Sequence, residues 1–128
     1  MRLHKKIQPE FEDARGGITK ILDDGKTNIK SILLITSKKG AVRANHYHKR
    51  DSHYCYMVYG KMEYSERPVG SKEKPTMHVV NKGEMAFSKP MVEHAMRFLE
   101  DTVWVALFRN CRHQEDYESD TVRVKMIG

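Results

Sequence analysis

Apolar and polar residues alternate in short runs along most of the chain. Successive side chains of a β-strand point to opposite faces, so alternation over about four to eight residues predicts a strand with one buried face. One run, Asn28–Thr36, is largely apolar (Ile29 and Ile32 to Ile35) and predicts a buried strand. The predicted strands are Ile18–Leu22, Asn28–Thr36, Val42–His48, His53–Tyr59, Lys61–Arg67, Thr76–Val80, Glu84–Ser88, Glu93–Leu99, Thr102–Arg109 and Thr121–Ile127.

Turn-forming residues separate these runs. Asp23–Lys26 predicts a hairpin turn, Ser37–Gly40 and Asn81–Gly83 predict tight turns, and Pro68–Pro75 predicts a charged loop. The polar stretch Met1–Asp13 is expected to be irregular or an edge strand. No segment of useful length repeats with a helical period, so no helix is predicted. Many short strands with frequent turns predict an all-β jelly-roll barrel, also called a double-stranded β-helix.

Length and composition limit the classes of protein to consider. The 128 residues suit one domain, 1–128, with one core. The sequence has no apolar run long enough for a membrane span, and its N-terminus lacks the apolar block of a secretory signal. The two cysteines, Cys55 and Cys111, do not have zinc-type spacing. We therefore expect a reduced, cytoplasmic protein.

The formal net charge of +6 favours anionic partners. Basic residues are scattered among acidic ones, and the sequence shows no helical motif that reads nucleic acid. The charge therefore indicates first an ordinary basic surface and second a small anionic substrate, such as one that carries a phosphate, and we expect no nucleic-acid partner.

Four histidines supply the candidate chemistry. His46 and His48 stand two residues apart on one predicted strand, so their side chains point to the same face. A hairpin turn at Lys49–Ser52 would bring His53 back beside His48. Imidazole groups gathered in this way typically bind a divalent transition metal, here Zn, Fe, Mn, Ni or Cu. In the alternative, a metal-free pocket uses them as acid and base. His4, His78 and His113 are expected on the surface or in loops.

The stretch Gly40–Gly60 resembles the first motif of the cupin family. That motif reads Gly, five residues, His-x-His, three or four residues, Glu, six residues, Gly. The chain matches every fixed position except one, because His53 stands where the family has Glu. The resemblance implies a cupin barrel with its core motifs at 40–60 and 83–98.

The stretch 83–98 resembles the second cupin motif, which reads Gly, five residues, Pro-x-Gly, two residues, His, three residues, Asn. Gly83 and His94 match, whereas Pro90 lies one position late, Met91 replaces Gly and Phe98 replaces Asn. The resemblance implies that His94 joins the other three histidines as a metal ligand. Four neutral imidazoles would leave the charge of the metal uncompensated, which favours an anionic ligand.

Strand alternation also predicts which side chains line the pocket. Ala44, Cys55 and Met57 should point inward with the histidines, as should Met96 and Phe98 near His94. Cys55 is then either a reactive thiol or a small apolar filler. The outward residues are Tyr54, Tyr56 and Val58. They need cover from a second subunit, which predicts a homodimer, or from a terminal strand of the same chain.

A narrower resemblance points to sugar chemistry. Asp13–Gly16 followed by Ile18 resembles the Asp-x-Arg-Gly start of sugar-nucleotide cupins. Arg43–Lys49 resembles the Arg-Gly-x-His-x-His stretch of nucleotide-sugar 3,4-ketoisomerases and of capsular-polysaccharide sugar epimerase-reductases, with Ala44 in place of Gly. The resemblance implies that His46 and His48 move protons next to a carbonyl without a metal, and that Arg43 binds a substrate phosphate or supports the site.

Three classes of function follow. The first is isomerisation or epimerisation of a nucleotide-linked keto-sugar, in which Arg43 and Lys49 would stabilise an enediolate and Tyr47 or Tyr54 could donate a proton. The second is a metal-dependent oxygenase or lyase acting on a small organic acid. The third is a non-catalytic protein that binds a metal or a metabolite. Under the first two, Arg43, Lys49, Cys55, Met57, Met96 and Phe98 are the expected substrate contacts.

Overall fold

The computed structural model describes residues 2–4, 6–110 and 113–127. Within these ranges β-strands predominate and one short helix is present. The elements in chain order are β1 (Arg2–His4), β2 (Phe11–Asp13), β3 (Gly16–Ile18), β4 (Ser31–Ser37), β5 (Val42–His48), β6 (His53–Tyr59), β7 (Lys61–Pro68), β8 (Thr76–Asn81), β9 (Met85–Ser88), β10 (Val92–Phe98), β11 (Thr102–Phe108), α1 (Gln114–Asp120) and β12 (Thr121–Arg123). None of the described helices is long and apolar enough to cross a membrane.

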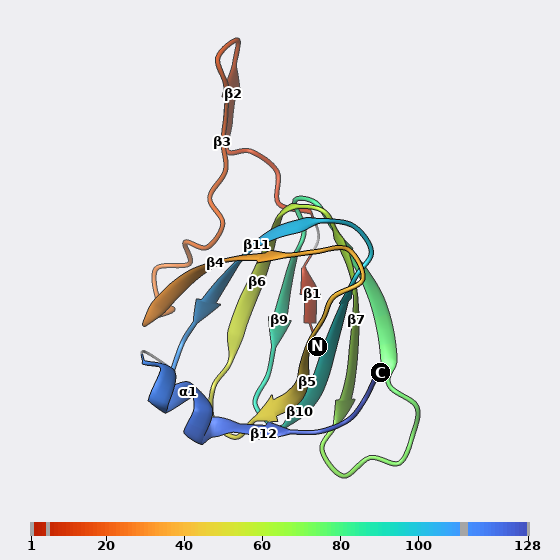
Figure 1. The fold of residues 1–128 in the computed structure, drawn as a ribbon. Helices are drawn as coiled ribbons and strands as arrows, with labels where there is room; N and C mark the ends of the chain where they lie inside the picture. The colour runs from red at the N-terminus through yellow and green to blue at the C-terminus, as the bar shows by residue number, and fades with distance from the viewer. Residues whose placement is uncertain (1, 5, 111–112, 128) are drawn as a thin grey trace.

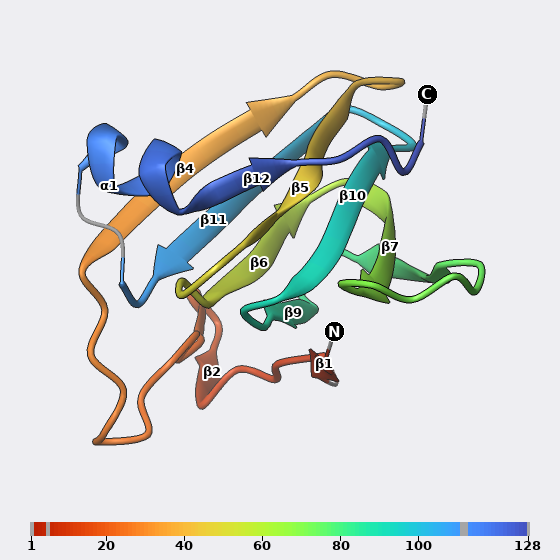
Figure 2. The same cartoon turned by 90° about the horizontal axis from the view of Figure 1, so that it is seen from below.

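Two five-stranded antiparallel sheets face each other and form the barrel (Figure 1). One sheet has the order β1-β9-β6-β11-β4, and the other has the order β12-β5-β10-β7-β8. Figure 2 shows the same two sheets from below, with β4 and β11 side by side. The predicted all-β jelly-roll barrel is therefore confirmed.

The inward faces of both sheets supply one hydrophobic core. The strands alternate as predicted: along β6, His53, Cys55 and Met57 are buried while Tyr54, Tyr56 and Val58 are only half-buried. The core residues are Cys55, Met57, Met62, Tyr64, Val80, Ala86, Met96, Phe98, Trp104, Ala106 and Phe108. At one end of this core, the histidines replace apolar side chains.

A separate hairpin, β2–β3, projects away from the barrel (Figure 1). The predicted strand Ile18–Leu22 is wrong, because the observed strand β3 ends at Ile18. In β3, Ile18 pairs with Phe11 of β2. The carboxylate of Asp13 closes this hairpin by accepting hydrogen bonds from Arg15 N at 2.9 Å and Nε at 3.0 Å. Such local side-chain bonds decide the position of a turn and leave little trace in hydrophobic periodicity.

The predicted hairpin turn at Asp23–Lys26 is only partly correct. Asp24 does close a turn there, because its Oδ1 accepts hydrogen bonds from the backbone N–H of Lys26 at 3.0 Å and of Thr27 at 2.8 Å. However, no described strand lies directly before it, so the turn does not join two paired strands.

The expectation that Asn28–Thr36 is buried throughout is also wrong. The strand is β4, which starts at Ser31 and lies at the edge of its sheet. Ile32 is 68% exposed and Leu34 is 71% exposed, whereas Ile35 packs against the core. An apolar run predicts burial, but it cannot show whether the covering surface belongs to the same chain.

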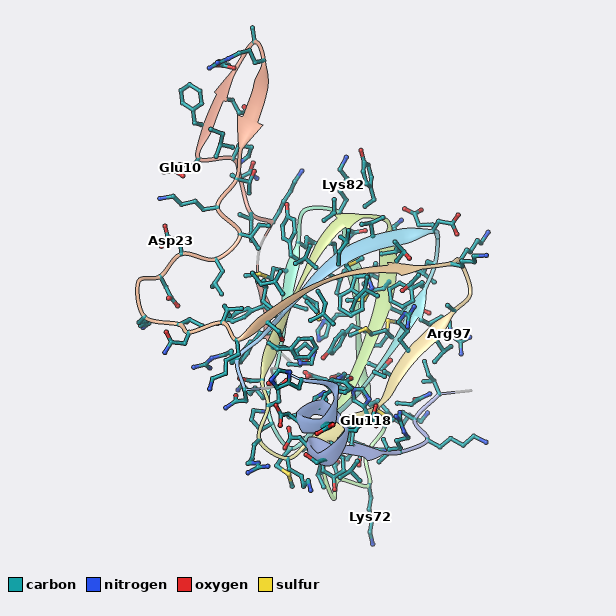
Figure 3. All side chains as sticks on the ribbon, turned by 60° about the vertical axis from the view of Figure 1, so that its left-hand side comes forward. Glu10, Asp23, Lys72, Lys82, Arg97 and Glu118 are labelled. Carbon is teal, nitrogen blue, oxygen red and sulfur yellow. The ribbon has the colours of Figure 1, made fainter. Side chains whose placement is uncertain are left out.

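The prediction of no helix is wrong at α1. Its seven residues are polar apart from Tyr117, which is too short a segment to show a helical period. The side chain of Asp116 accepts a hydrogen bond from the backbone N–H of His113 at 3.3 Å, as in a helix cap. The predicted strand Thr121–Ile127 is shorter than expected and ends at Arg123. Figure 3 labels Glu118 of this helix, which lies at the opposite end of the barrel from Lys82.

Candidate active site

Three strands bring the four predicted histidines together at one end of the barrel. His46 and His48 lie on β5, His53 begins β6, and His94 lies on β10 as the register partner of His46. All four side chains are buried. The ring centroids are 4.7 Å apart for His46–His48 and His46–His94, 5.5 Å for His48–His53, 5.6 Å for His53–His94 and 5.7 Å for His48–His94. The sequence therefore predicted the members of this cluster.

The backbone around the cluster is held in unusual conformations. Ala44 has φ of 69°, Asn45 has φ of 55°, and the pairing of β5 with β10 shifts register here. Met91, before β10, has φ of 59°. Ala44 and Met91 stand at positions where the resembled motifs carry glycine and this chain does not, and glycine adopts this left-handed conformation without steric cost. The side chain of Asn45 accepts hydrogen bonds from the backbone N–H of Met126 at 3.2 Å and of Ile127 at 3.1 Å, which anchors the bulge.

Four buried ring nitrogens have no hydrogen-bond partner among the described residues: His46 Nδ1, His48 Nε2, His53 Nδ1 and His94 Nε2. His46, His48 and His94 offer ligand atoms within 4.8 Å of one another. His94 Nδ1 lies 3.2 Å from the carbonyl oxygen of Val92, which can only accept, so the ring hydrogen is on Nδ1 and the lone pair is on Nε2. Orphaned lone pairs that gather in this way fit a divalent transition metal.

His53 belongs to a second group of potential ligands, with His48 and Asp51. The side chain of Asp51 is fully buried, and its Oδ2 lies 3.5 Å from His53 Nδ1. Its Oδ1 accepts a hydrogen bond from the backbone N–H of Asn110 at 2.9 Å. In the sequence, Asp51 stands in a predicted polar turn, and nothing in that local pattern indicates that it is a partner of His53. The histidine cluster thus consists of two groups of donor atoms that share His48.

Burial keeps three of the clustered histidines, His46, His48 and His94, neutral. Desolvation, with the neighbouring imidazoles, lowers the pKa of His46 to about 3. The same causes lower the pKa of His48 to about 4, although Asp51 and Asp120 act in the opposite direction. Burial also holds the pKa of His94 well below its ordinary value. Neutral imidazole is the form that can accept a proton or bind a metal.

A cavity of about 350 Å³ opens beside the cluster. Its polar lining includes the histidines His46, His53 and His94, with Arg43 and Arg123. Its apolar lining is Ile35, Val42, Ala44, Met96, Trp104 and Phe108, together with the ring of Tyr117. The combination of neutral acid–base groups, two cations and an apolar wall suits a polar, negatively charged organic molecule.

Only some of the predicted substrate-contacting residues line this cavity. Arg43 and Met96 line the cavity. Cys55, Met57 and Phe98 point inward as predicted, but they lie fully buried in the packed core and are not on the cavity wall. Burial raises the pKa of the Cys55 thiol, which makes it an apolar filler rather than a nucleophile. The side chain of Lys49 is exposed outside the cavity lining.

The C-terminal segment contributes site residues that the sequence analysis missed. The ring centroid of Tyr117 lies 5.0 Å from that of His48 and 6.0 Å from that of His46. The carboxylate of Asp120 lies 3.9 Å from His48 Nδ1, and Arg123 lies opposite His46 in the register of β12 and β5. Nothing in the local pattern marked these residues, because only the pairing of β12 with β5 brings them to the site.

The three histidines that were predicted to lie on the surface or in loops are His4, His78 and His113. His78 and His113 are exposed, and the side chain of His4 lies outside the described part of the structure, as does Cys111.

Comparison with known proteins places the fold. No family model matches the sequence, and no curated protein matches it. A double mutant of the QdtA 3,4-ketoisomerase from Thermoanaerobacterium thermosaccharolyticum, solved with TDP, is 23% identical with a TM-score of 0.74, and the match covers 95% of this chain and 86% of that one. A 3,4-ketoisomerase from Helicobacter canadensis is 19% identical with a TM-score of 0.76, covering 95% and 89%.

A third similar structure is the capsular polysaccharide assembling protein CapF from Staphylococcus aureus. It is 20% identical with a TM-score of 0.67, and the match covers 92% of this chain but only 34% of CapF. At these identities the comparison establishes the architecture and not the chemistry. The chain has the cupin fold that the solved sugar 3,4-ketoisomerases also have.

Proposed function

We propose that the protein is an isomerase that moves a carbonyl group between neighbouring carbons of a nucleotide-linked keto-sugar, in the biosynthesis of a polysaccharide. The observation that carries this proposal is the buried, neutral pair His46 and His48, of which His46 lines a cavity with two arginines. The likeness in fold to ketoisomerases solved with TDP and with TDP-4-keto-6-deoxyglucose supports it.

The proposed reaction needs only proton transfers, so it suits a pair of histidines. One imidazole takes the proton from the carbon next to the carbonyl, and the carbonyl oxygen becomes an enediolate oxygen that is then protonated. The hydroxyl on the neighbouring carbon loses its proton and becomes the new carbonyl, while the former carbonyl carbon receives a proton. One carbon is oxidised and its neighbour is reduced, so no external oxidant is required. His48 Nε2 and His46 Nδ1 are buried without a hydrogen-bond partner among the described residues, so both nitrogens are open for this work.

The two arginines of the cavity suit the charges of the proposed substrate. Arg43 is held by its Nε bond to Ser37 Oγ at 2.7 Å and by a second bond to the carbonyl oxygen of Thr36 at 3.0 Å. The side chain of Arg123 is exposed, and its Nη2 donates a hydrogen bond to Glu118 Oε2 at 3.2 Å. A cavity of about 350 Å³ is small among ligand sites, so we place the sugar inside and the diphosphate against the arginines at the mouth.

The site can be considered in a metal-bound and a metal-free form, and in the metal-bound form the proposed cofactor is a divalent metal ion. His46, His48 and His94 would hold it, and it would supply positive charge beside the enediolate. A ring nitrogen that binds a metal cannot accept a proton at the same time. In the metal-bound form the proton carrier is therefore His53, whose Nδ1 faces the buried carboxylate of Asp51.

The test of the proposed function is hydrogen exchange with solvent. The protein is incubated with TDP-4-keto-6-deoxyglucose in D₂O, and the sugar is followed by proton NMR. We expect loss of the proton signal at C3 and the appearance of a 3-keto product, at a rate that depends on protein concentration. No exchange at C3, at millimolar substrate and with or without added Zn, Mn or Fe, would reject the isomerase.

The metal content of the purified protein distinguishes the metal-bound form of the site from the metal-free form. We expect about one equivalent of a single divalent metal in the wild-type protein by elemental analysis. His94→Ala should lose it, because one of the three converging nitrogens is removed, whereas the exposed control His78→Ala should keep it. If the wild type holds no metal and takes up none on soaking, the histidines act as a metal-free acid–base set. In that case EDTA should leave the exchange rate unchanged.

A homodimer is the proposed assembly. The outer face of the sheet that contains β6, β11 and β4 carries Tyr54, Tyr56, Ile32 and Leu34, and the terminal strands β1 and β12 lie at sheet edges where they leave this face open. Light scattering should give a mass of about twice 14.9 kDa. Leu34→Lys should shift it to a monomer, while Met77→Lys, which changes another exposed apolar residue, on β8, should leave the mass unchanged. A wild-type monomer at high concentration would contradict this assembly.

A further inference from the structure

The hydroxyl of Thr121 lies where the C-terminal segment meets the histidine cluster. Thr121 begins β12 and is the register partner of His48 on β5. Its Oγ1 is 2.6 Å from the carbonyl oxygen of Tyr117 and 3.2 Å from His48 Nδ1. One hydroxyl group therefore has two hydrogen-bond partners, and one of them is a histidine of the site.

The hydroxyl has a single hydrogen, and this fixes the direction of both bonds. The carbonyl oxygen of Tyr117 can only accept, so Thr121 donates its hydrogen there. The bond to His48 then requires a hydrogen on Nδ1, which donates to Thr121 Oγ1. Because a neutral imidazole carries one ring hydrogen, the lone pair of His48 must be on Nε2.

The surroundings of His48 favour the same tautomer. Asp120 Oδ2 lies 3.9 Å from Nδ1, so its negative charge stabilises a hydrogen on that nitrogen. This carboxylate is itself fixed by the backbone N–H groups of Arg50 at 2.9 Å and Asp51 at 2.8 Å. On the other side of the ring, Nε2 is buried and has no hydrogen-bond partner among the described residues.

We propose that Thr121 is a positioning residue that holds His48 in the Nδ1–H tautomer and so presents an unprotonated Nε2 to the centre of the cluster. The role is the same whether Nε2 accepts a proton from the keto-sugar or binds a metal. It assigns a part of the site to β12, which lies outside both cupin motifs. Its effect on turnover rests on the proposed function, whereas its effect on the tautomer does not.

The test uses Thr121→Val, which keeps the shape of the side chain but removes the hydroxyl, and Thr121→Ser, which keeps the hydroxyl. Long-range ¹⁵N–¹H NMR of the metal-free protein, with His48 assigned by its loss in His48→Gln, reports which ring nitrogen carries the hydrogen. We expect Nδ1–H in the wild type and in Thr121→Ser, and a mixture of tautomers in Thr121→Val. Turnover, or Zn²⁺ affinity by calorimetry, should fall about 10- to 100-fold in Thr121→Val and recover in Thr121→Ser.

The outcomes separate this proposal from the proposed function. Hydrogen on Nε2 of wild-type His48 would overturn it, even if Thr121→Val failed to fold. An unchanged tautomer and an unchanged Zn²⁺ affinity in a folded Thr121→Val would also overturn it. If the keto-sugar is not turned over but Thr121→Val still changes the tautomer and weakens Zn²⁺ binding, the proposed function fails and the positioning role stands.

Discussion

Replacing His48 with Asn should lower kcat for keto-sugar isomerisation by about a thousandfold. A positioned general acid or base typically contributes about 10²- to 10⁴-fold to a rate, and an amide cannot take up a proton at neutral pH. His48 lies at the meeting point of the two ligand groups, so its loss also removes a metal donor from both of them. The effect is therefore expected in either form of the site. KM should change little, because the proposed phosphate contacts of Arg43 and Arg123 remain.

The measurement is the rate of C3 exchange and product formation under saturating substrate, with circular dichroism to verify the fold of the variant. His78→Asn is the matched control, since it makes the same change on the exposed strand β8 and should keep the wild-type kcat. A His48→Asn protein that is folded and retains more than about a tenth of the wild-type kcat would show that this imidazole is not part of the chemistry.

The sequence was informative wherever a pattern is imposed by the barrel itself. Alternation along β6 and β10 predicted their inward faces, and the spacing of His46, His48 and His53 predicted their clustering. The predicted hairpin between these histidines is wrong, because β5 and β6 belong to different sheets, and the connection at 49–52 crosses from one sheet to the other. Both the inward faces and the clustering follow from a strand period of two residues, which is local and visible in one sequence. The glycine position filled by Ala44 also had a physical meaning, because its backbone is left-handed in the structure.

The features that the sequence did not predict depend on contacts between residues far apart in the chain. Thr121 is 73 residues from His48, and Asp120 reaches the turn after β5 from a distance of 69 and 70 residues. These partners come from a short polar helix and a three-residue strand, which carry no periodic signal. The exposure of β4 was missed for a related reason, since an apolar run shows that a surface needs cover but not what covers it.

Acid should unfold the metal-free protein at an unusually mild pH. In the folded state the pKa is about 3 for His46 and about 4 for His48, against an ordinary value of 6.5. The unfolded chain therefore binds more protons below pH 6.5, and the free energy of unfolding falls as the pH falls. The histidine contribution to stability is complete above pH 6.5 and is lost progressively down to about pH 3 to 4. In this window each histidine lowers the free energy of unfolding by on the order of 1 kcal/mol per pH unit. The typical total free energy of unfolding is about 5–15 kcal/mol.

Urea unfolding of the EDTA-treated protein between pH 8 and pH 4 measures this dependence. We expect a flat midpoint above pH 7 and a steep fall below pH 6, with loss of the fold between about pH 5 and pH 4. His46→Gln removes one of the titrating rings, so its slope below pH 6 should be shallower by on the order of 1 kcal/mol per pH unit, whereas the exposed control His78→Gln should keep the wild-type slope. Bound Zn²⁺ should move the fall to lower pH, because protons must then compete with the metal for the same ring nitrogens. A midpoint that stays constant from pH 7 to pH 5 in the metal-free protein would mean that the cluster accepts protons without cost, and hence that its imidazoles are better solvated than their burial indicates.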